Sequence, residues 1–311
     1  MRPRTKGELS GEARMQTVGV VGLGSMGAGI AEALLRAGFQ THGFDVDPAR
    51  MRRFQAKGGM PGTLAEVAPR LDALVIVVLN AAQMEEVLFG AEAIAEALSQ
   101  GTVVIACPTV PPAAAQAMET RCQATGLHYL DAPISGGSVK AAAGQLSIMA
   151  SGTAEAFTAS RPALDAMAET VFELGDRAGP GSAMKVINQL LAGVHISAMA
   201  EAVTFGMTQG VDPATTVEVI GQCAGQSWMF DNRGPHVAAG DYTPHSAVDI
   251  WLKDLGIVLD VARAAKFSAP LTSAALAQFT AASGSGLGAE DDAAVAKVYA
   301  RNAGLTLPGE G

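Results

Sequence analysis

The stretch that decides the fold is residues 17–27, which read Thr17-Val18-Gly19-Val20-Val21-Gly22-Leu23-Gly24-Ser25-Met26-Gly27. A short β-branched run leads directly into a glycine-rich turn, and a helical pattern follows over residues 27–37. Gly22 permits a tight turn, Gly24 lets the backbone approach a pyrophosphate, and Gly27 allows close packing of helix on strand. The helix N-terminus adds free N–H groups and a partial positive charge. The stretch therefore predicts that residues 22–27 bind a dinucleotide; a plain glycine-rich turn is the alternative.

The sequence on either side of this turn predicts an α/β domain. Short β-rich runs occur at residues 17–21, 40–45, 73–79, 102–106 and 128–132, and helical stretches at 27–37, 91–98 and 113–125. Runs at 145–152 and 171–174 predict further strands at one edge. Such alternation requires crossover connections and hence a mostly parallel sheet. We therefore expect a Rossmann-type doubly wound domain over residues 15–178.

The β pattern stops after Gly175, and a long helix is predicted next. Gly179-Pro180-Gly181 interrupts the chain, and Ser182 is a candidate N-cap for a helix that runs to about residue 209. The rest, to about residue 303, is Ala-rich and helical in pattern. We expect an all-α domain over residues 179–311, joined through this helix and serving substrate binding and oligomerisation.

The composition excludes two broad classes of protein. The chain has 311 residues, of which 49% are hydrophobic and 16% charged, and its formal net charge is −9. Nucleic-acid recognition requires clustered Lys and Arg, so no nucleic-acid partner is expected. The most apolar long window, residues 186–207, is interrupted by Asn188, Gln189, His195 and Glu201. A membrane span requires about 20 apolar residues with few interruptions, so we expect a buried helix and no membrane partner.

Cysteine usage and the N-terminus add two smaller expectations. Cys107, Cys122 and Cys223 are odd in number and lack the close spacing of metal ligands. We expect buried free thiols, no bound metal and a reducing, cytoplasmic location. Residues 1–14 are polar, mixed in charge and without the apolar stretch of a signal peptide, so we expect a disordered leader.

An acidic residue at the end of the second strand bears on the choice of cofactor. Asp45 follows Gly27 by 18 residues, close to the spacing of a ribose-binding carboxylate. Such a carboxylate accepts hydrogen bonds from both ribose hydroxyls and repels a 2′-phosphate. The next residues are Val46, Asp47 and Pro48, with no Arg among them. We therefore expect NAD and not NADP, and we interpret Asp47 as an N-cap beside Pro48.

A second glycine-containing loop follows the 128–132 strand. It reads Asp131-Ala132-Pro133-Ile134-Ser135-Gly136-Gly137 and leaves the carboxyl end of a strand, the edge where doubly wound sheets bind ligands. The Ser135 hydroxyl and the accessible amides of Gly136 and Gly137 suit a carboxylate. An ordinary turn is the alternative.

The start of the long helix carries a lysine with two amide side chains on the same face. Asn188 and Gln189 follow Lys185 by three and four residues. A lysine partly removed from water can exchange protons with a hydroxyl that is being oxidised, and the amide of Gln189 can hold the same oxygen. A solvated helix face is the alternative.

Together these segments resemble the β-hydroxyacid dehydrogenase family, which includes 3-hydroxyisobutyrate dehydrogenase and tartronate semialdehyde reductase. The resemblance covers residues 17 to about 299 and is carried by residues 22–27, 131–137, 181–189 and Lys253-Asp254-Leu255-Gly256. It implies that Lys185 is the catalytic lysine and that Ser135, Gly136 and Gly137 bind the substrate carboxylate. It also implies further cofactor residues: Leu79, Asn80, Thr109, and Lys253 near the nicotinamide.

Within this family the chain is most similar to the L-threonate dehydrogenase branch, on residues 185–187, 189–195, 227–230, 232–233, 240–244 and 246–250. The branch implies oxidation of the 2-hydroxyl of a four-carbon sugar acid, from L-threonate to 2-oxo-tetronate. The chain departs from the family at Gln189, where Asn is usual, and at Cys107-Pro108-Thr109, where a Ser or Thr pair is usual. Both departures lie beside the expected substrate position and argue against the usual three-carbon substrates of the family. The alternative substrates are 3-hydroxyisobutyrate and 2-hydroxy-3-oxopropionate.

Alternatives of other classes also remain at this point. Related folds include imine reductases, which generally replace the lysine, so its presence favours alcohol oxidation. A non-catalytic NAD sensor is disfavoured by the lysine together with the intact glycine turn. No role is assigned to His195, Trp228 or Trp251. The long apolar helix and the Ala-rich second domain predict a homodimer or homotetramer.

Overall fold

A computed structural model describes residues 15–310, so the expected leader, residues 1–14, lies outside the described residues. The chain divides into two compact units, Met1–Lys185 and Val186–Gly311. The first unit contains an eight-stranded sheet in the order β2-β1-β3-β4-β5-β7-β6, with β8 beside β7. Five strands run parallel, namely β1 (Thr17–Val21), β2 (Gln40–Phe44), β3 (Ala73–Ile76), β4 (Val103–Ala106) and β5 (His128–Asp131). The predicted parallel sheet is confirmed.

The remaining strands form one edge of this sheet. They are β6 (Ile134–Ser135), β7 (Leu146–Gly152) and β8 (Ala168–Glu173). Strand β7 runs antiparallel to β5 and β6 and parallel to β8. The two edge strands predicted at 145–152 and 171–174 are therefore present. The short strand β6 was expected to be loop, because two residues are too few to give an alternating pattern.

Helices cover both faces of the sheet. They are α1 (Ser25–Arg36), α2 (Pro48–Gln55), α3 (Leu64–Val67), α4 (Ala81–Phe89), α5 (Ile94–Ala97), α6 (Pro112–Ala124), α7 (Gly137–Ala143) and α8 (Ala154–Met167). Side chains of α1, α7 and α8 belong to the core on one face of the sheet, and those of α4, α5 and α6 belong to the core on the other. Within β3, Val75 points to the first face while Leu74 and Ile76 point to the second, so the strand is buried on both sides. The sheet is therefore doubly wound.

The parallel strands bring the predicted cofactor residues to one edge. Strands β1 to β5 all end at this edge, so the loops that begin at Gly22, Asp45, Val77, Cys107 and Ala132 lie along it in the order of the strands. Strand β1 has β2 on one side and β3 on the other, so the winding changes direction there. Ligands of doubly wound sheets bind at such a switch point.

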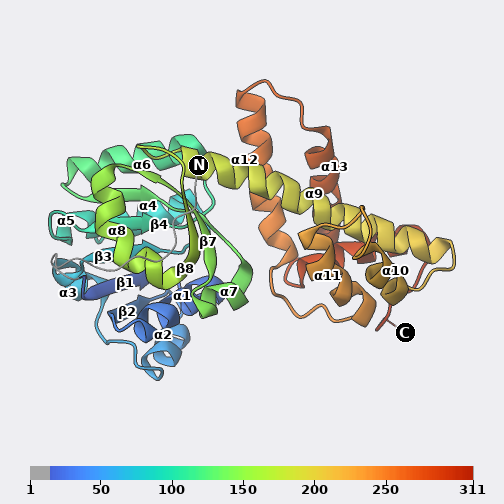
Figure 1. Ribbon diagram of the computed structural model, residues 1–311, viewed down its shortest axis with the longest axis horizontal. Coiled ribbons are helices and arrows are strands. Elements are labelled where there is room, and N and C mark those ends of the chain that lie inside the picture. The colour runs from blue at the N-terminus through green and yellow to red at the C-terminus, as the bar shows by residue number, and fades with distance from the viewer. Residues whose placement is uncertain (1–14, 311) are drawn as a thin grey trace. The chain divides into compact units, whose positions relative to one another are not determined.

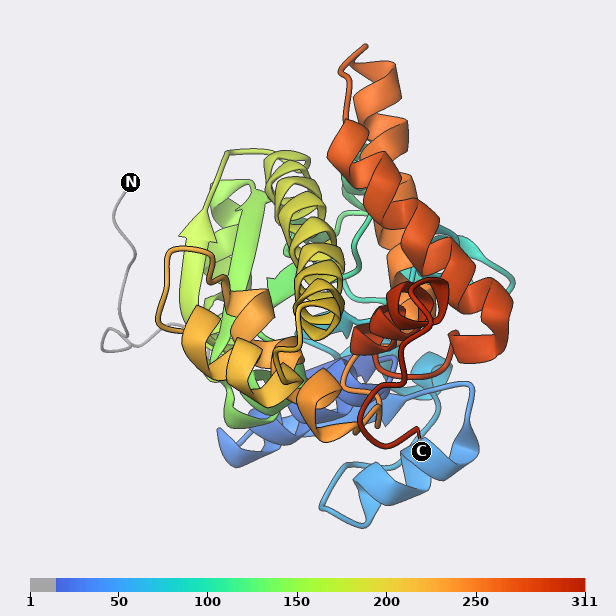
Figure 2. The same ribbon diagram turned by 90° about the vertical axis from the view of Figure 1, so that its right-hand side faces the viewer.

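The second unit consists of helices, as predicted. They are α9 (Pro180–Thr208), which begins in the first unit, then α10 (Pro213–Ile220), α11 (Trp228–Ala239), α12 (Val248–Ala264), α13 (Pro270–Ala282) and α14 (Ala296–Asn302). Figures 1 and 2 show α9 as one uninterrupted helix.

By length and composition α9 could cross a membrane, but Ile196 and Val203 on this helix are fully buried in the core of the second unit, together with Leu255 of α12. Such burial is that of a core helix.

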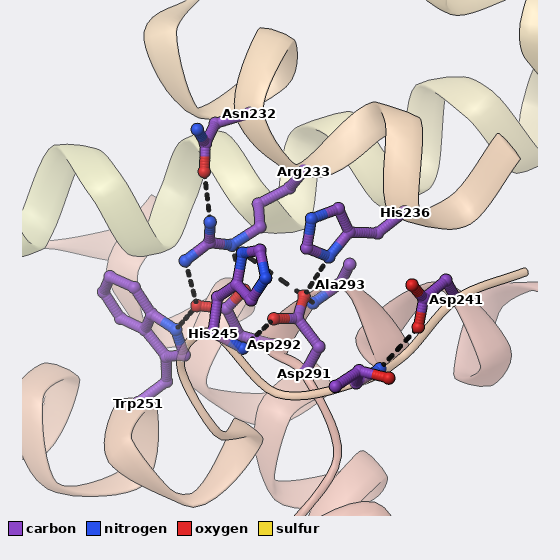
Figure 3. Close-up of polar contacts among 10 residues, drawn as sticks. Asn232, Arg233, His236, Asp241, His245, Trp251, Asp291, Asp292 and Ala293 are labelled. Atoms are coloured by element: carbon purple, nitrogen blue, oxygen red, sulfur yellow. Dashed lines mark hydrogen bonds and ion pairs between the residues drawn. The ribbon is translucent and has the colours of Figure 1, made fainter. Parts of the chain in front are cut away.

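The second unit contains a buried ionic network (Figure 3). Arg233 Nε of α11 donates to Asp292 Oδ1 at 2.5 Å, and Trp251 Nε1 of α12 donates to Asp292 Oδ2 at 2.9 Å. The neighbouring Asp291 Oδ1 lies 3.0 Å from His236 Nδ1. Both aspartates have no exposed surface. The network therefore ties α11 and α12 to the short 3₁₀ turn Asp292–Val295.

We expect Arg233→Ala to lower the free energy of unfolding by about 3–5 kcal/mol, because it leaves a buried carboxylate pair without its guanidinium. Arg263→Ala is the matched control: its ion pair with Asp260 is exposed, so its loss should cost under about 1 kcal/mol. Urea denaturation followed by tryptophan fluorescence measures both, since Trp251 belongs to the network. Equal losses of unfolding free energy in the two variants would show that the buried network stabilises the protein no more than an exposed ion pair does.

Candidate active site

The glycine turn after β1 has the shape expected of an anion cradle. Gly22 has φ of +92°, and a Cβ on this residue would lie 2.6 Å from the carbonyl oxygen of Val77. A Cβ on Gly27 would lie 1.7 Å from the carbonyl oxygen of Gly22. Helix α1 begins at Ser25 with Gly24 as its N-cap, and no side chain caps its first amides. These amides can therefore bind phosphate at the positive end of the helix.

Asp45 lies beside this turn at the end of β2. Its carboxylate accepts hydrogen bonds from the amides of Leu23 (2.7 Å) and Asp47 (2.9 Å), and its side chain is 4% exposed. Burial acts to raise the pKa of Asp45, but these two hydrogen bonds and the nearby Arg50 guanidinium hold it below its ordinary value. Asp47 caps α2 by accepting from the amide of Ala49, as predicted. Asp45 is thus a fixed negative charge beside the turn.

Asp45 forms an ion pair with an arginine, although none of the three residues directly after Asp45 is an arginine. The helical turn that begins at Pro48 brings Arg50 back toward the strand, and its Nη1 lies 3.3 Å from Asp45 Oδ2. The expectation that no arginine lies near Asp45 is therefore corrected, because Arg50 is five residues further along the chain. The i, i+3 spacing of the helix cap Asp47 and Arg50 was the signal that could have placed this arginine near the end of β2.

Three other predicted cofactor residues follow β3 and β4 at the same edge, whereas the fourth, Lys253, lies on α12 of the second unit. Leu79 is 56% exposed, and its amide donates to Gln83 Oε1. Asn80 is the N-cap of α4, where its side chain accepts from the amide of Gln83. Thr109 is partly exposed three residues beyond β4. The structure therefore brings these three residues to the edge that also carries the glycine turn.

The predicted substrate loop contains two consecutive glycines at positive φ. Ser135 ends β6 and is paired with Ser147 of β7, so its position is set by the sheet. Gly136 has φ of +135° and Gly137 has φ of +75°, a region that favours glycine. Helix α7 then begins at Gly137. Ser135 and the two glycines are therefore consecutive residues that lead from the sheet into this helix.

The buried carboxylate of Asp131, at the end of β5, binds the start of α9. Its Oδ2 accepts from the amides of Gly179 (2.9 Å) and Ser182 (2.8 Å) and from Ser151 Oγ (3.2 Å), and its Oδ1 accepts from Ser182 Oγ (2.7 Å). The side chain is 1% exposed. Burial raises the pKa of Asp131, whereas the hydrogen bonds from Ser182, Gly179 and Ser151 lower it. Because all four groups donate, the carboxylate satisfies them in its ionised form.

The expected N-cap role of Ser182 is wrong. Helix α9 begins two residues earlier, at Pro180, and the Ser182 hydroxyl donates to Asp131 instead of accepting from a helix amide. Gly181 brings the helix close to the sheet: its amide donates to Ser151 Oγ, and a Cβ there would lie 2.4 Å from the carbonyl oxygen of Met149. The first turn of α9 is therefore packed against β5 and β7.

Lys185 follows this anchored turn and is 8% exposed, so the solvated-face alternative is wrong. In the second unit, one turn further along α9, Gln189 is 7% exposed. Its Nε2 donates to Asp254 Oδ2 at 2.5 Å, and its Oε1 accepts from Asn188 Nδ2 at 2.9 Å. Lys253 Nζ lies 2.6 Å from Asp254 Oδ1 and forms an ion pair with it. The angles of this contact are not those of a hydrogen bond. The contact of Asp254 with Gln189 was missed, because 65 residues separate them and no local pattern links them.

The residues left without a role fall in different environments. Trp251 is 3% exposed and stacks on Phe279, so it is a core residue of the second unit. Trp228 is 55% exposed, and His195 is partly exposed on α9. Among the cysteines, Cys107 and Cys122 are buried, and burial raises the pKa of each thiol to about 12. Cys223 is exposed, which corrects the expectation that all three are buried.

Two family models together match most of the chain. Residues 17–175 match the model described as the NAD binding domain of 6-phosphogluconate dehydrogenase. Residues 179–299 match the model described as "NAD-binding of NADP-dependent 3-hydroxyisobutyrate dehydrogenase". The two matches meet between β8 and α9, where the sheet gives way to helices.

Full-length relatives agree with these matches. The L-threonate dehydrogenase of Cupriavidus necator is 50% identical over 296 residues, which cover 95% of this chain and 99% of that protein. The L-threonate dehydrogenase of Escherichia coli K12 is 48% identical and covers 94% of this chain and 96% of its own length. A solved structure of 3-hydroxyisobutyrate dehydrogenase from Salmonella typhimurium has a TM-score of 0.86 at 48% identity, covering 91% of this chain and 99% of that one. The chain belongs to the β-hydroxyacid dehydrogenase family and is an NAD-dependent hydroxyacid dehydrogenase.

Proposed function

We propose that this enzyme oxidises the 2-hydroxyl of L-threonate to give 2-oxo-tetronate, with Lys185 as the acid and base. The observation that carries the substrate is similarity over nearly the whole chain, at 43–50% identity, to five proteins named L-threonate dehydrogenase. The buried position of Lys185 supports its role, because a lysine in a solvated face would have its ammonium in water.

The residues of the first unit fit an NAD molecule at the carboxyl edge of the sheet. We assign the pyrophosphate to the amides of the turn, residues 22–27, where any Cβ on Gly22 or Gly27 would occupy the space of the backbone. We assign the adenosine ribose to Asp45, and the remaining cofactor contacts to Leu79, Asn80, Thr109 and Lys253. When bound, NAD accepts the hydride that leaves the carbon under oxidation.

The substrate carboxylate belongs at Ser135, Gly136 and Gly137, which offer one hydroxyl and two amides. Lys185 takes the proton of the substrate hydroxyl as the carbonyl forms. An amide nitrogen carries two hydrogens, and Gln189 gives one of them to Asp254. The second can be donated to the substrate oxygen, so Asp254 orients Gln189 for this contact. Asn188, which donates to Gln189, is the alternative ligand of that oxygen.

A second candidate substrate, 3-hydroxyisobutyrate, is favoured by one observation. The Salmonella typhimurium structure that carries this name is 48% identical to the present chain. The two substrates differ in the position of the hydroxyl and in the number of other hydroxyls. Initial rates of NAD reduction with a panel of C3 to C6 hydroxy acids distinguish them directly.

The two parts of the chain have different roles in this proposal. We assign residues 15–178 to NAD binding and residues 179–311 to substrate binding and assembly. We further propose a cytoplasmic homodimer or homotetramer. Exposed large apolar side chains in the second unit support assembly: Ile187, Leu191, Phe205, Val211, Val219, Trp228, Phe267 and Leu271 are each at least 41% exposed.

The first test concerns the chemistry. Lys185→Ala should lower kcat on L-threonate by about 10²–10⁴-fold, because it removes a proton-transfer group of the transition state. NADH affinity, measured by fluorescence titration, should be nearly unchanged. Ser135→Ala should chiefly raise KM through the lost carboxylate contact. Lys140→Ala and Ser147→Ala are the controls, an exposed lysine and the cross-strand partner of Ser135. A near-normal kcat in Lys185→Ala rules the mechanism out.

The second test concerns the anchor of α9. Asp131→Asn places an amide against groups that all donate, so it should lower the free energy of unfolding by about 2–4 kcal/mol. Ser182→Ala keeps the charge and should cost about 1 kcal/mol. Ser160→Ala, a buried serine of α8 that donates to the carbonyl of Phe157, is the matched control.

Measurements of kcat on these three variants distinguish a loss of α9 anchoring from a general loss of stability. At a temperature where all variants are folded, as shown by full NADH-binding stoichiometry, Asp131→Asn should lower kcat by roughly tenfold or more. Of the two serine variants, Ser182→Ala should have a lower kcat than the parent, whereas the control Ser160→Ala should keep the parent value. Equal kcat in Ser182→Ala and Ser160→Ala would mean that the hydroxyl does not help to position Lys185.

The third test concerns assembly. Light scattering coupled to size-exclusion chromatography at micromolar concentration should give a mass of two or four times 31.6 kDa, because contact between chains covers the exposed apolar side chains. A single 31.6 kDa species over this concentration range contradicts the proposal.

A further inference from the structure

The adenosine side of the cofactor edge holds an arginine whose charge is already neutralised. Arg50 lies in the first turn of α2, with Nη1 3.3 Å from Asp45 Oδ2 and Nε 3.7 Å from Asp47 Oδ2. The same Nη1 would lie 4.0 Å from a Cβ on Gly24. The guanidinium therefore lies between the carboxylate at the end of β2 and the glycine turn after β1.

We propose that Arg50 is a latent ligand for the 2′-phosphate of NADP. Its ion pairs with Asp45 and Asp47 prevent the guanidinium from binding that phosphate. The enzyme then prefers NAD because two carboxylates hold its arginine, and not because it lacks one. This inference rests on the proposed position of the adenosine ribose at Asp45. It assigns to Arg50 a part in cofactor selectivity that the strand-end carboxylate alone does not explain.

The balance of charge explains why the phosphate is rejected. A 2′-phosphate carries roughly −1.5 to −2 charges at neutral pH. Asp45 and Asp47 together with Arg50 sum to −1 when all three are ionised, and the lowered pKa of Asp45 keeps its carboxylate ionised there. A phosphate would therefore meet net negative charge. Removing the charge of Asp45 leaves the guanidinium opposed only by Asp47, at the longer distance of 3.7 Å.

Arg50 is the movable partner of this cluster. Its side chain is 43% exposed, so it can turn toward a ligand without disturbing the core. Asp45 is held by the amides of Leu23 and Asp47 and cannot move so freely. An arginine that merely supports Asp45 would add nothing to NADP binding once that carboxylate lost its charge. The two roles therefore predict different results in a double-mutant cycle.

The test measures cofactor binding without turnover. Asp45→Asn removes the charge but keeps an oxygen that can accept from the Leu23 amide. Dissociation constants for NADH and NADPH come from fluorescence titration of the full-length enzyme as isolated. We expect the parent to bind NADPH roughly 100-fold more weakly than NADH, because like charges are opposed. Asp45→Asn should bind NADPH about 10–100-fold more tightly than the parent and NADH about tenfold more weakly.

A second substitution isolates the arginine. Adding Arg50→Ala to Asp45→Asn should abolish the gain in NADPH affinity. Adding Arg53→Ala, which removes the same charge from an exposed position on the same helix, should preserve most of it. In the parent background Arg50→Ala should leave NADPH binding weak, because the carboxylates already neutralise the guanidinium.

The outcomes separate this inference from the proposed function. Equal NADPH affinity with and without Arg50 in the Asp45→Asn background overturns the role of Arg50, as does weaker NADH binding with no gain for NADPH. If Asp45→Asn alters neither cofactor, the ribose does not lie at Asp45, and both the proposed cofactor position and the inference fail. The role of Lys185 is untouched by any of these results, since no substrate is present.

Discussion

The buried carboxylate of Asp131 is the interaction on which the first unit depends. A carboxylate taken out of water costs several kcal/mol unless its hydrogen bonds are replaced, and here four donors replace them. Two of these donors are amides at the start of α9, where the helix also presents partial positive charge. The strand that leads into the predicted substrate loop and the helix that carries Lys185 therefore share one ionised group. Displacement of either element would leave the carboxylate without donors.

The second unit uses buried charge in the same way. Asp291 and Asp292 are fully buried and are matched by Arg233, His236 and the indole N–H of Trp251. Neither aspartate could be buried alone, so the network orders the chain on both sides of it. Closer to the lysine, Gln189 is likewise oriented by the buried carboxylate of Asp254. The first turn of α9 and the side chain of Gln189 are thus each held by a buried carboxylate that would be costly to leave unpaired.

The sequence predicted the elements whose signals are local. The strands of the parallel sheet alternate with helices at regular spacing, and β3 is apolar throughout because both of its faces are covered. The glycine turn was recognised because positive φ and close backbone approach both require glycine. The N-cap at Asp47 was found because proline follows it. Strand β6 was missed because a two-residue strand exists only through its pairing with β7.

The amino-acid sequence by itself therefore determined the doubly wound sheet, the helical second part, the position of the glycine turn and the family of the enzyme. These depend on periodicity, on glycine conformation and on motifs that are contiguous in the chain. Only the tertiary structure decided what Ser182, Arg50 and Asp254 contact. Ser182 was predicted to cap a helix, but its hydroxyl donates a hydrogen bond to Asp131, 51 residues away in the sequence. Hydrogen bonds and ion pairs between distant segments leave no periodic trace, because the partner of each charge is chosen by where the fold places it.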